Sequence, residues 1–146
     1  MLNQYAKMLK ENQIKVTPQR LEILRYLDGH HTHPTVEDIY TALKTKNPSL
    51  SKTTVYNSLE ILNKHKLIQT LTISCSESRY DIREDLHHHF LCETCGTIID
   101  IDIACPNIKK IVKGGHQVYE VHGYFRGICK NCITKGRSKS GYQNIA

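Results

Sequence analysis

Two Cys-x-x-Cys motifs constrain this chain of 146 residues more than any other feature. The first motif contains Cys92 and Cys95, and the second contains Cys129 and Cys132, after 33 intervening residues. Each motif can present two thiolates to one metal ion, so the two motifs together predict a tetrahedral four-cysteine Zn2+ site. Because the protein would fill all four positions, we predict that this zinc is structural.

Composition narrows the classes of protein that fit. The length suits one ordinary domain or two small ones. The chain contains no apolar run of about 18 residues and no signal-peptide core, so we expect no membrane partner and a cytoplasmic location. In a reducing compartment, six cysteines favour metal binding over disulfides, and we interpret Cys75 and Cys105 as ordinary apolar residues. The net charge of +6 and the pI of 9.0 favour a polyanionic partner.

The first half of the chain predicts three or four short helices followed by a hairpin. Residues 3–13 are compatible with a short amphipathic helix. Three further helices are predicted to begin after the N-cap residues Thr17, Thr35 and Ser51, the last running over 52–64. Alternating segments at 67–74 and 79–82 then predict two paired strands. This order is typical of a winged helix-turn-helix.

The third capped helix has the composition of a helix that reads a DNA groove. Its polar side chains are Lys52, Thr53, Thr54, Tyr56, Asn57 and Ser58. Small hydroxyls, an amide, an aromatic ring and a cation near the N-terminus suit contacts with phosphates and base edges. For this helix alone, a merely solvent-exposed face would be the simpler interpretation, and the neighbouring winged-helix pattern favours DNA. We therefore predict contacts from these residues, Ser58 excepted, and from Arg20.

The second half predicts a small α/β domain, which makes the whole chain α+β. Strands are expected near 90–91, 97–103 and 117–121, with a helix at 105–113 whose apolar residues face inward. A domain this small needs the support of zinc and of a partner subunit. The predicted boundaries are 1–83 for the winged-helix domain, 84–86 for a hinge and 87–134 for the zinc-binding domain, and 135–146 for a disordered tail.

Histidines and aspartates supply further ligands. Strand alternation places His87 and His89 on one face, so these two side chains and Asp100 would meet if their strands pair. Mixed imidazole and carboxylate ligands suit Fe2+, Mn2+ or Zn2+. A histidine run can also be an exposed polar loop, an interpretation that the adjacent Cys-x-x-Cys makes less attractive.

The chain resembles the Fur family of metal-dependent repressors from near its N-terminus to Cys132. The segments that carry the resemblance are 16–20, 33–35, 38–40, 51–59, 79–81, 87–92, 95–96, Cys129 and Cys132. The resemblance implies an N-terminal winged-helix domain that binds double-stranded operator DNA, a C-terminal dimerisation domain, and a homodimer. It also implies a regulatory Fe2+ or Mn2+ held by His33, Asp81, His87, His89 and Asp100. Those five ligands come from both sides of the hinge, so the metal would favour one domain spacing.

Asp100 suggests the signal to which the protein responds. Iron-uptake repressors of the family usually have Glu at this place, whereas peroxide-sensing members have Asp. The resemblance therefore implies that bound Fe2+ reacts with hydrogen peroxide and that His33 or His87 is oxidised. The alternative is a ferric-uptake-type regulator that senses the availability of ferrous iron, or of zinc or manganese.

The chain also departs from the family pattern. Residues 121–127 lack the acidic residue of a further metal site, and Asn107 stands where some iron regulators have a carboxylate. We therefore interpret His88, His116 and His122 as surface or packing residues, and His30 and His31 as loop residues.

Two enzyme classes are less consistent with the sequence. A thiol oxidoreductase would need Cys92 and Cys95 as free nucleophiles, but four thiolates on one zinc are not free. A metallohydrolase would need an open coordination position and a general base, and five protein ligands leave little room for water. We predict a non-enzymatic regulator with no small-molecule substrate.

Overall fold

The fold divides between Glu84 and Asp85 into two units, residues 1–84 and 85–146, which we call unit 1 and unit 2. The structure is a computed structural model and describes residues 2–73, 77–82, 87–103, 107–118 and 121–137. The predicted hinge at 84–86 and most of the predicted tail lie outside the described residues. Among the described residues, no helix has the length and apolar character needed to cross a bilayer.

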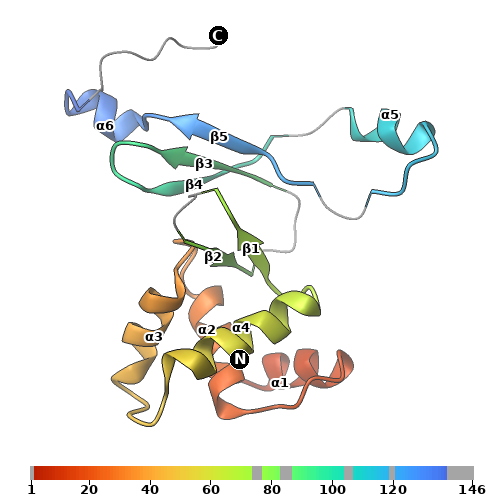
Figure 1. The fold of residues 1–146 in the computed structure, drawn as a ribbon, viewed down its shortest axis with the longest axis vertical. Helices are drawn as coiled ribbons and strands as arrows, with labels where there is room; N and C mark the ends of the chain where they lie inside the picture. Colours follow the sequence, from red (N-terminus) through yellow and green to blue (C-terminus); the bar gives the residue numbers. More distant parts are fainter. Residues whose placement is uncertain (1, 74–76, 83–86, 104–106, 119–120, 138–146) are drawn as a thin grey trace. The chain divides into compact units, whose positions relative to one another are not determined.

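Four helices build unit 1, as Figure 1 shows. Their bounds are α1 (Leu2–Glu11), α2 (Pro18–Asp28), α3 (Val36–Lys44) and α4 (Lys52–Lys64). The three predicted N-caps are confirmed: the side chains of Thr17, Thr35 and Ser51 each accept a hydrogen bond from a backbone N–H in the first turn. Local sequence therefore determines where these helices start.

Apolar side chains from all four helices and the hairpin form the core of unit 1. The buried members are Tyr5, Leu9, Ile14, Ile23, Leu24, Leu27, Ile39, Leu43, Leu50, Val55, Leu59, Leu62, Ile68 and Tyr80. On α4 the buried positions recur with helical spacing, and Lys52, Thr53, Tyr56 and Asn57 remain exposed. The core thus leaves one face of α4 available.

Ser58 does not lie on that exposed face, contrary to the prediction. It is 6% exposed, and its hydroxyl donates to the carbonyl oxygen of Thr54 at 2.7 Å. Position 58 is three residues beyond buried Val55, which turns it towards the core. The backbone hydrogen bond satisfies its hydroxyl there.

The predicted hairpin of unit 1 is present as a pair of short antiparallel strands, β1 (Gln69–Leu71) and β2 (Arg79–Asp81). Arg79 also forms an isolated antiparallel bridge with Thr35, the N-cap of α3. Tyr80 N donates to Pro34 O at 3.1 Å. These backbone contacts attach the loop before α3 to β2, the strand that ends at Asp81.

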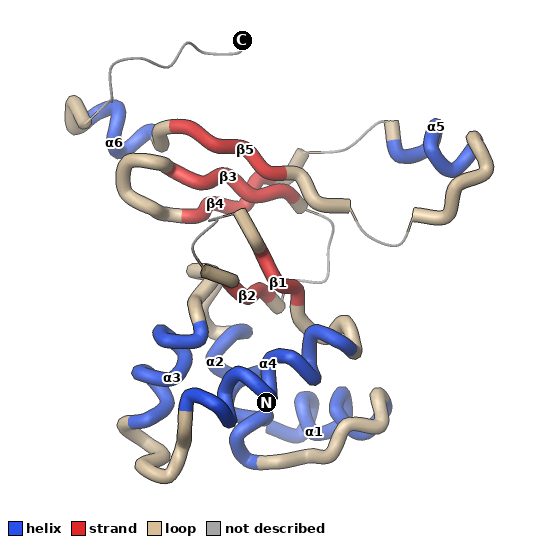
Figure 2. The backbone as a smooth tube through the Cα atoms, viewed as in Figure 1, coloured by secondary structure: helices blue, strands red, loops and turns tan. Residues whose placement is uncertain are grey.

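Unit 2 is built on a three-stranded sheet in the order β4-β3-β5, shown in Figure 2. The strands are β3 (His88–Cys92), β4 (Ile98–Ile101) and β5 (Tyr124–Gly127), and the helices are α5 (Ile108–Lys113) and α6 (Lys130–Thr134). The central strand β3 pairs antiparallel with β4 and parallel with β5. The histidine run and the first cysteine of the chain's metal motifs therefore lie on or beside the central strand.

Several predictions for unit 2 were wrong. The third strand was expected at 117–121, but Gln117, Val118 and Val121 are not in a strand, and β5 lies at Tyr124–Gly127. In the helix predicted at 105–113, residues 105 and 106 lie outside the described part, and α5 starts at Ile108. Its apolar residues were expected to face inward, but Ile111 and Val112 are 47% and 54% exposed. The apolar periodicity of this segment correctly predicted a helix. It did not predict that Ile111 and Val112 would be exposed.

Candidate metal sites and DNA-binding surface

The four motif cysteines converge in unit 2, as predicted. One sulfur atom from each of Cys92, Cys95, Cys129 and Cys132 lies within 4.8 Å of all the others. The Sγ atoms of Cys95 and Cys129 are 3.8 Å apart. This separation far exceeds a disulfide bond of about 2.05 Å. It equals the edge of a tetrahedron with Zn–S bonds of about 2.3 Å, roughly 3.8 Å.

Two local backbone structures position these four thiols. At the first motif, Cys92 N donates to Thr97 O at 2.9 Å and Gly96 N donates to Cys92 O at 2.8 Å, which closes a tight turn. Gly96 has φ +73°, a conformation that a side chain would strain. At the second motif, Cys129 is the N-cap of α6 and Cys132 lies in its first turn. A turn and a helix start thus each present a cysteine pair.

The electrostatics of the cluster favour a bound cation. For Cys92, burial opposes ionisation, but hydrogen bonds from the backbone of Cys129, Cys95 and Thr94 lower its pKa to about 6. For Cys132, burial and then the neighbouring thiols raise the pKa to about 12. Four crowded thiolates need a positive charge at their centre, and four sulfur donors suit Zn2+. The donor set therefore fits a structural zinc ion.

A second group of ligands in unit 2 lies where β3 and β4 pair. His89 is opposite Asp100 in the antiparallel register. Asp100 Oδ1 is 3.7 Å from His87 Nε2 and 3.8 Å from His89 Nε2. The two imidazole rings are 4.5 Å apart between centroids and inclined by 65°. Unit 2 therefore brings together two imidazoles and one carboxylate, as strand alternation predicted.

His88 has other neighbours, as expected for the intervening residue of a strand. It is 2% exposed, and its ring lies beside the Cα of Gly123, where an added Cβ would be 2.2 Å from His88 Nδ1. Its ring also makes an edge contact with Phe125, at 6.2 Å between centroids. These contacts agree with the interpretation of His88 as a packing residue.

Unit 1 holds its own pair of predicted ligands, His33 and Asp81. A ring nitrogen of His33 and a carboxylate oxygen of Asp81 lie within 4.8 Å of each other. Both residues are buried. His33 has φ +52°, in the left-handed region that is uncommon for residues with a side chain. Such strained positions cluster at functional sites.

Arg79 supports the backbone of His33, a role that the sequence did not indicate. Its Nη1 donates to His33 O at 3.2 Å, and Glu77 lies 3.7 Å from its other terminal nitrogen. Together with the Thr35–Arg79 bridge, this contact holds the His33 loop against β2. Only the pairing of two segments distant in sequence reveals such a residue.

The family model of the ferric uptake regulator family matches residues 11–125. The chain belongs to the ferric uptake regulator family. A peroxide-responsive repressor, PerR, of Staphylococcus aureus strain Mu50 is 35% identical over 143 residues, which cover 92% of this chain and 93% of that protein.

Solved structures of Fur-family proteins share the fold. The Helicobacter pylori ferric uptake regulator, whose structure is described as revealing three functional metal-binding sites, has a TM-score of 0.72 and 28% identity, with 96% of this chain and 93% of that chain covered. The Campylobacter jejuni peroxide stress regulator has a TM-score of 0.68 and 28% identity, with 90% and 98% covered. The predicted α+β fold of the family is thereby confirmed.

The predicted DNA-contacting residues of this Fur-family chain divide into two groups. Lys52, Thr53, Tyr56 and Asn57 lie exposed on α4, with Tyr56 53% exposed. Thr54 is half-buried, and its hydroxyl lies 2.8 Å from the hydroxyl of Ser51 at the helix cap. The exposed group forms the surface that α4 offers to a partner.

Arg20 is only partly available for such contacts. Its Nη1 donates to Lys15 O at 2.5 Å, and its backbone N–H donates to the Thr17 cap. The guanidinium therefore stabilises the segment that leads into α2. The sequence shows that Arg20 carries a positive charge. It does not show that the carbonyl oxygen of Lys15 accepts a hydrogen bond from the guanidinium.

Proposed function

We propose that this chain is a homodimeric transcriptional repressor of the cytoplasm whose regulatory metal site senses hydrogen peroxide. The observation that carries the proposal is the meeting of His87, which directly precedes β3, with His89 on β3 and Asp100 on β4. The ligand class suits Fe2+ and Mn2+. The carboxylate at position 100 belongs to Asp and not to the longer Glu, as in the peroxide-sensing members that the sequence resembles. The 35% identical S. aureus protein is named a peroxide-responsive repressor.

Unit 1 would supply the DNA-binding surface. It has a helix with a polar, exposed face after three shorter helices, and a two-stranded wing after that helix. In helix-turn-helix proteins such a helix enters the major groove, and side chains near its N-terminus contact base edges. Lys52 and Tyr56 would then contact DNA phosphates or bases from the first two turns of α4.

His33 and Asp81 of unit 1 would complete the ligand set begun by His87, His89 and Asp100 of unit 2. Each unit separately presents buried or half-buried nitrogen and carboxylate donors close together. Ligands from both units would favour the domain arrangement in which all five reach one ion. Metal occupancy would thereby select the spacing of two recognition helices in a dimer, and so the affinity for two DNA half-sites.

Peroxide would act on the ligands themselves. Fe2+ bound by these residues would activate hydrogen peroxide; overall, one imidazole would lose two electrons and gain one oxygen atom, while the peroxide is reduced to water. An imidazole of His33 or His87 that gains one oxygen atom is a poorer nitrogen donor. The two units then lose their common ligand set, and the repressor leaves DNA. Mn2+ satisfies the same donors without this oxidation.

Unit 2 would form the dimer. Its exposed large apolar side chains include Ile99, Ile103, Phe125 and Ile133, which are 40–59% exposed. Among the described residues of unit 2, the buried apolar side chains are Leu91, Cys92, Ile98, Cys129 and Cys132. A unit with so small a core and so much exposed apolar surface is stabilised by burial against a second copy.

The testing experiment measures DNA binding by the zinc-containing protein loaded with Fe2+ or with Mn2+, before and after a brief low dose of peroxide. The DNA is a duplex selected from a randomised pool by the Mn2+-loaded protein. We expect peroxide to abolish binding with Fe2+ and to leave binding with Mn2+ unchanged. Metal-dependent binding that survives peroxide would instead support a regulator of the ferric-uptake type.

Mass spectrometry of the same samples locates the oxidation. Trypsin releases residues 26–44, which contain His30, His31 and His33, so fragment ions must assign the added oxygen. In the peptide that contains His87, the adjacent His88 is an internal control because it packs beside Gly123. Oxygen on His33 or His87, and not on these neighbours, is the expected result. Oxygen spread over all histidines would contradict a ligand-specific reaction.

A further inference from the structure

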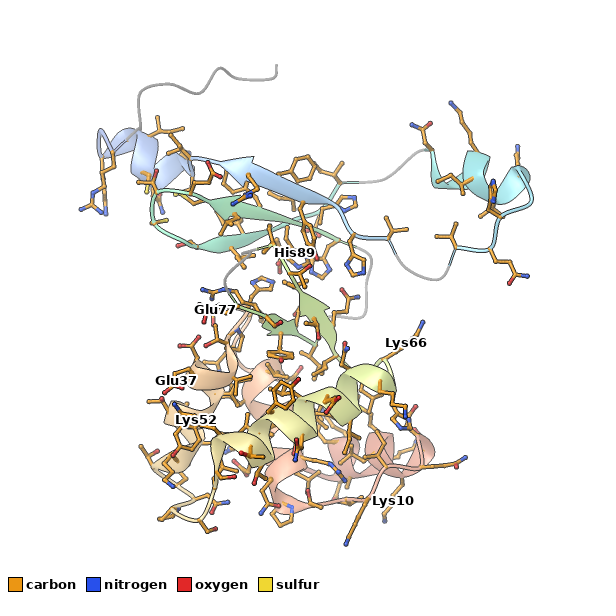
Figure 3. The ribbon with its side chains drawn as sticks, viewed as in Figure 1. Lys10, Glu37, Lys52, Lys66, Glu77 and His89 are labelled. Carbon is orange, nitrogen blue, oxygen red and sulfur yellow. The ribbon has the colours of Figure 1, made fainter. Side chains whose placement is uncertain are left out.

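Lys52 is held by an acidic side chain from another helix. Lys52 is the first residue of α4, and its Nζ lies 2.6 Å from Glu37 Oε2 in the first turn of α3. Figure 3 shows the two side chains beside each other where these helices approach. Lys52 Nζ also lies 5.5 Å from the centre of the Tyr40 ring. The ammonium group therefore has a carboxylate and an aromatic face as neighbours.

The position of Lys52 makes the Glu37 carboxylate important. The N-terminus of a helix carries partial positive charge, which disfavours a cation in the first turn. Glu37 offsets this repulsion with its hydrogen bond, which is also the main reason why the pKa of Lys52 is raised. Both side chains remain more than half exposed, at 57% and 59%. The pair is accessible to an incoming anion and is weak enough to be exchanged.

We propose that Glu37 competes with a DNA phosphate for Lys52 and thereby limits the affinity of this protein for DNA. The inference rests on the proposed DNA-binding function of α4. A phosphate that binds Lys52 must displace the Glu37 carboxylate. The carboxylate then remains on the first turn of α3, where it repels the phosphate backbone. An internal competitor of this kind lowers non-specific binding most, because that binding is mainly electrostatic.

The test compares Glu37→Gln with the wild-type protein, both full-length, zinc-containing and loaded with Mn2+. Fluorescence anisotropy measures binding to the selected duplex and to a mixed-sequence duplex over a range of salt concentrations. Glu37→Gln should bind about threefold to tenfold more tightly at low salt. Its plot of log K against log salt should be steeper by about one unit, because one more phosphate contact is not offset by a carboxylate.

Glu11→Gln is the matched control. Glu11 lies on α1 and pairs with Lys7 at 3.7 Å, and these side chains are 62% and 75% exposed. The substitution therefore removes the same charge and releases another lysine, away from α4. We expect its DNA affinity to remain within about twofold of the wild type, because the pair that it breaks is exposed and involves no residue of α4. Thermal unfolding of each variant checks that the fold is intact.

Lys52→Ala and the double variant Glu37→Gln/Lys52→Ala decide whether Glu37 acts through Lys52. Lys52→Ala should weaken binding, and adding Glu37→Gln to it should tighten binding by clearly less than Glu37→Gln tightens binding of the wild type. The inference is overturned if Glu37→Gln binds no more tightly than wild type, or if it tightens binding equally without Lys52. Wild-type protein that binds no duplex would overturn the proposed function as well; wild-type binding with no effect of Glu37→Gln would overturn this inference alone.

Discussion

His89 lies opposite Asp100 in the antiparallel pair of β3 and β4, with 3.8 Å between His89 Nε2 and Asp100 Oδ1. This distance is longer than a direct hydrogen bond of about 2.7–3.2 Å. It leaves room for both atoms to bind the same cation. The strand register thus turns two residues that are eleven positions apart into a pair of candidate ligands.

Asp100→Ala should weaken Mn2+ binding about tenfold or more, because it removes the carboxylate that faces both His87 and His89. Calorimetric titration of the zinc-containing protein measures the affinity. Asp102→Ala, which changes an exposed carboxylate two residues away, is the matched control. Equal Mn2+ affinities for the two variants would exclude Asp100 as a ligand.

Cys92→Ser should eliminate bound zinc and destabilise unit 2, because Cys92 is fully buried in the cluster and accepts a hydrogen bond from Cys129 N at 3.3 Å. Elemental analysis gives the zinc content, and size-exclusion chromatography with light scattering gives the oligomeric state. We expect no bound zinc and less dimer. Cys75→Ser, outside both motifs, is the control. A zinc-bound dimer of Cys92→Ser would contradict the structural role.

Asp38→Ala should lower the stability of unit 1 by about 1 kcal/mol at neutral pH. The Asp38 carboxylate accepts hydrogen bonds from the backbone N–H and hydroxyl of Thr35, at 2.9 and 2.8 Å, and completes a capping box. For a unit of this size the melting temperature should fall by about 4–8 °C. Glu60→Ala, an exposed carboxylate on α4, should change it little.

The same cap predicts how stability depends on pH. The backbone and side-chain hydrogen bonds from Thr35 lower the pKa of Asp38. A carboxyl group with a lowered folded-state pKa stabilises the fold above its unfolded pKa of about 3.9. That contribution is lost as the pH falls through the folded value. The difference in melting temperature between wild type and Asp38→Ala should therefore shrink in acid; a constant difference would argue against the carboxylate.

Gly123→Ala should destabilise unit 2 by about 1–3 kcal/mol, because the new Cβ would overlap the His88 ring. The double variant His88→Ala/Gly123→Ala removes the clash. Its loss of stability in thermal unfolding should be smaller than the sum of the two single losses. Additive losses would show that His88 does not fill the space that Gly123 leaves.

Tyr56→Ala should weaken DNA binding while the fold remains intact, because the Tyr56 ring is 53% exposed on α4 and contributes little to the core. Anisotropy with the selected duplex and a melting curve measure the two effects separately. Tyr26→Ala provides a contrast, since Tyr26 packs against the core and should lower stability first. Unchanged DNA affinity of Tyr56→Ala would place the contact surface elsewhere.

The sequence alone determined the features that depend on neighbouring residues. Thr17, Thr35 and Ser51 identified three helix starts because a cap acts within one turn. The two Cys-x-x-Cys motifs identified a four-cysteine cluster because metal chemistry restricts which ligands can combine. Strand alternation identified the faces of His87 and His89. In each case the information lies within a few residues or in the chemistry of one ligand set.

The tertiary structure decided the features that depend on pairing between distant segments. It placed β5 at Tyr124–Gly127, paired parallel with β3, whereas the described residues Gln117, Val118 and Val121 of the predicted strand are not in a strand. It turned Ser58 inward, and it brought Arg79 to the carbonyl oxygen of His33 and Glu37 to Lys52. These contacts join residues up to 46 positions apart. No local propensity encodes them, because they form only when the packing of the core determines the register and approach of whole elements.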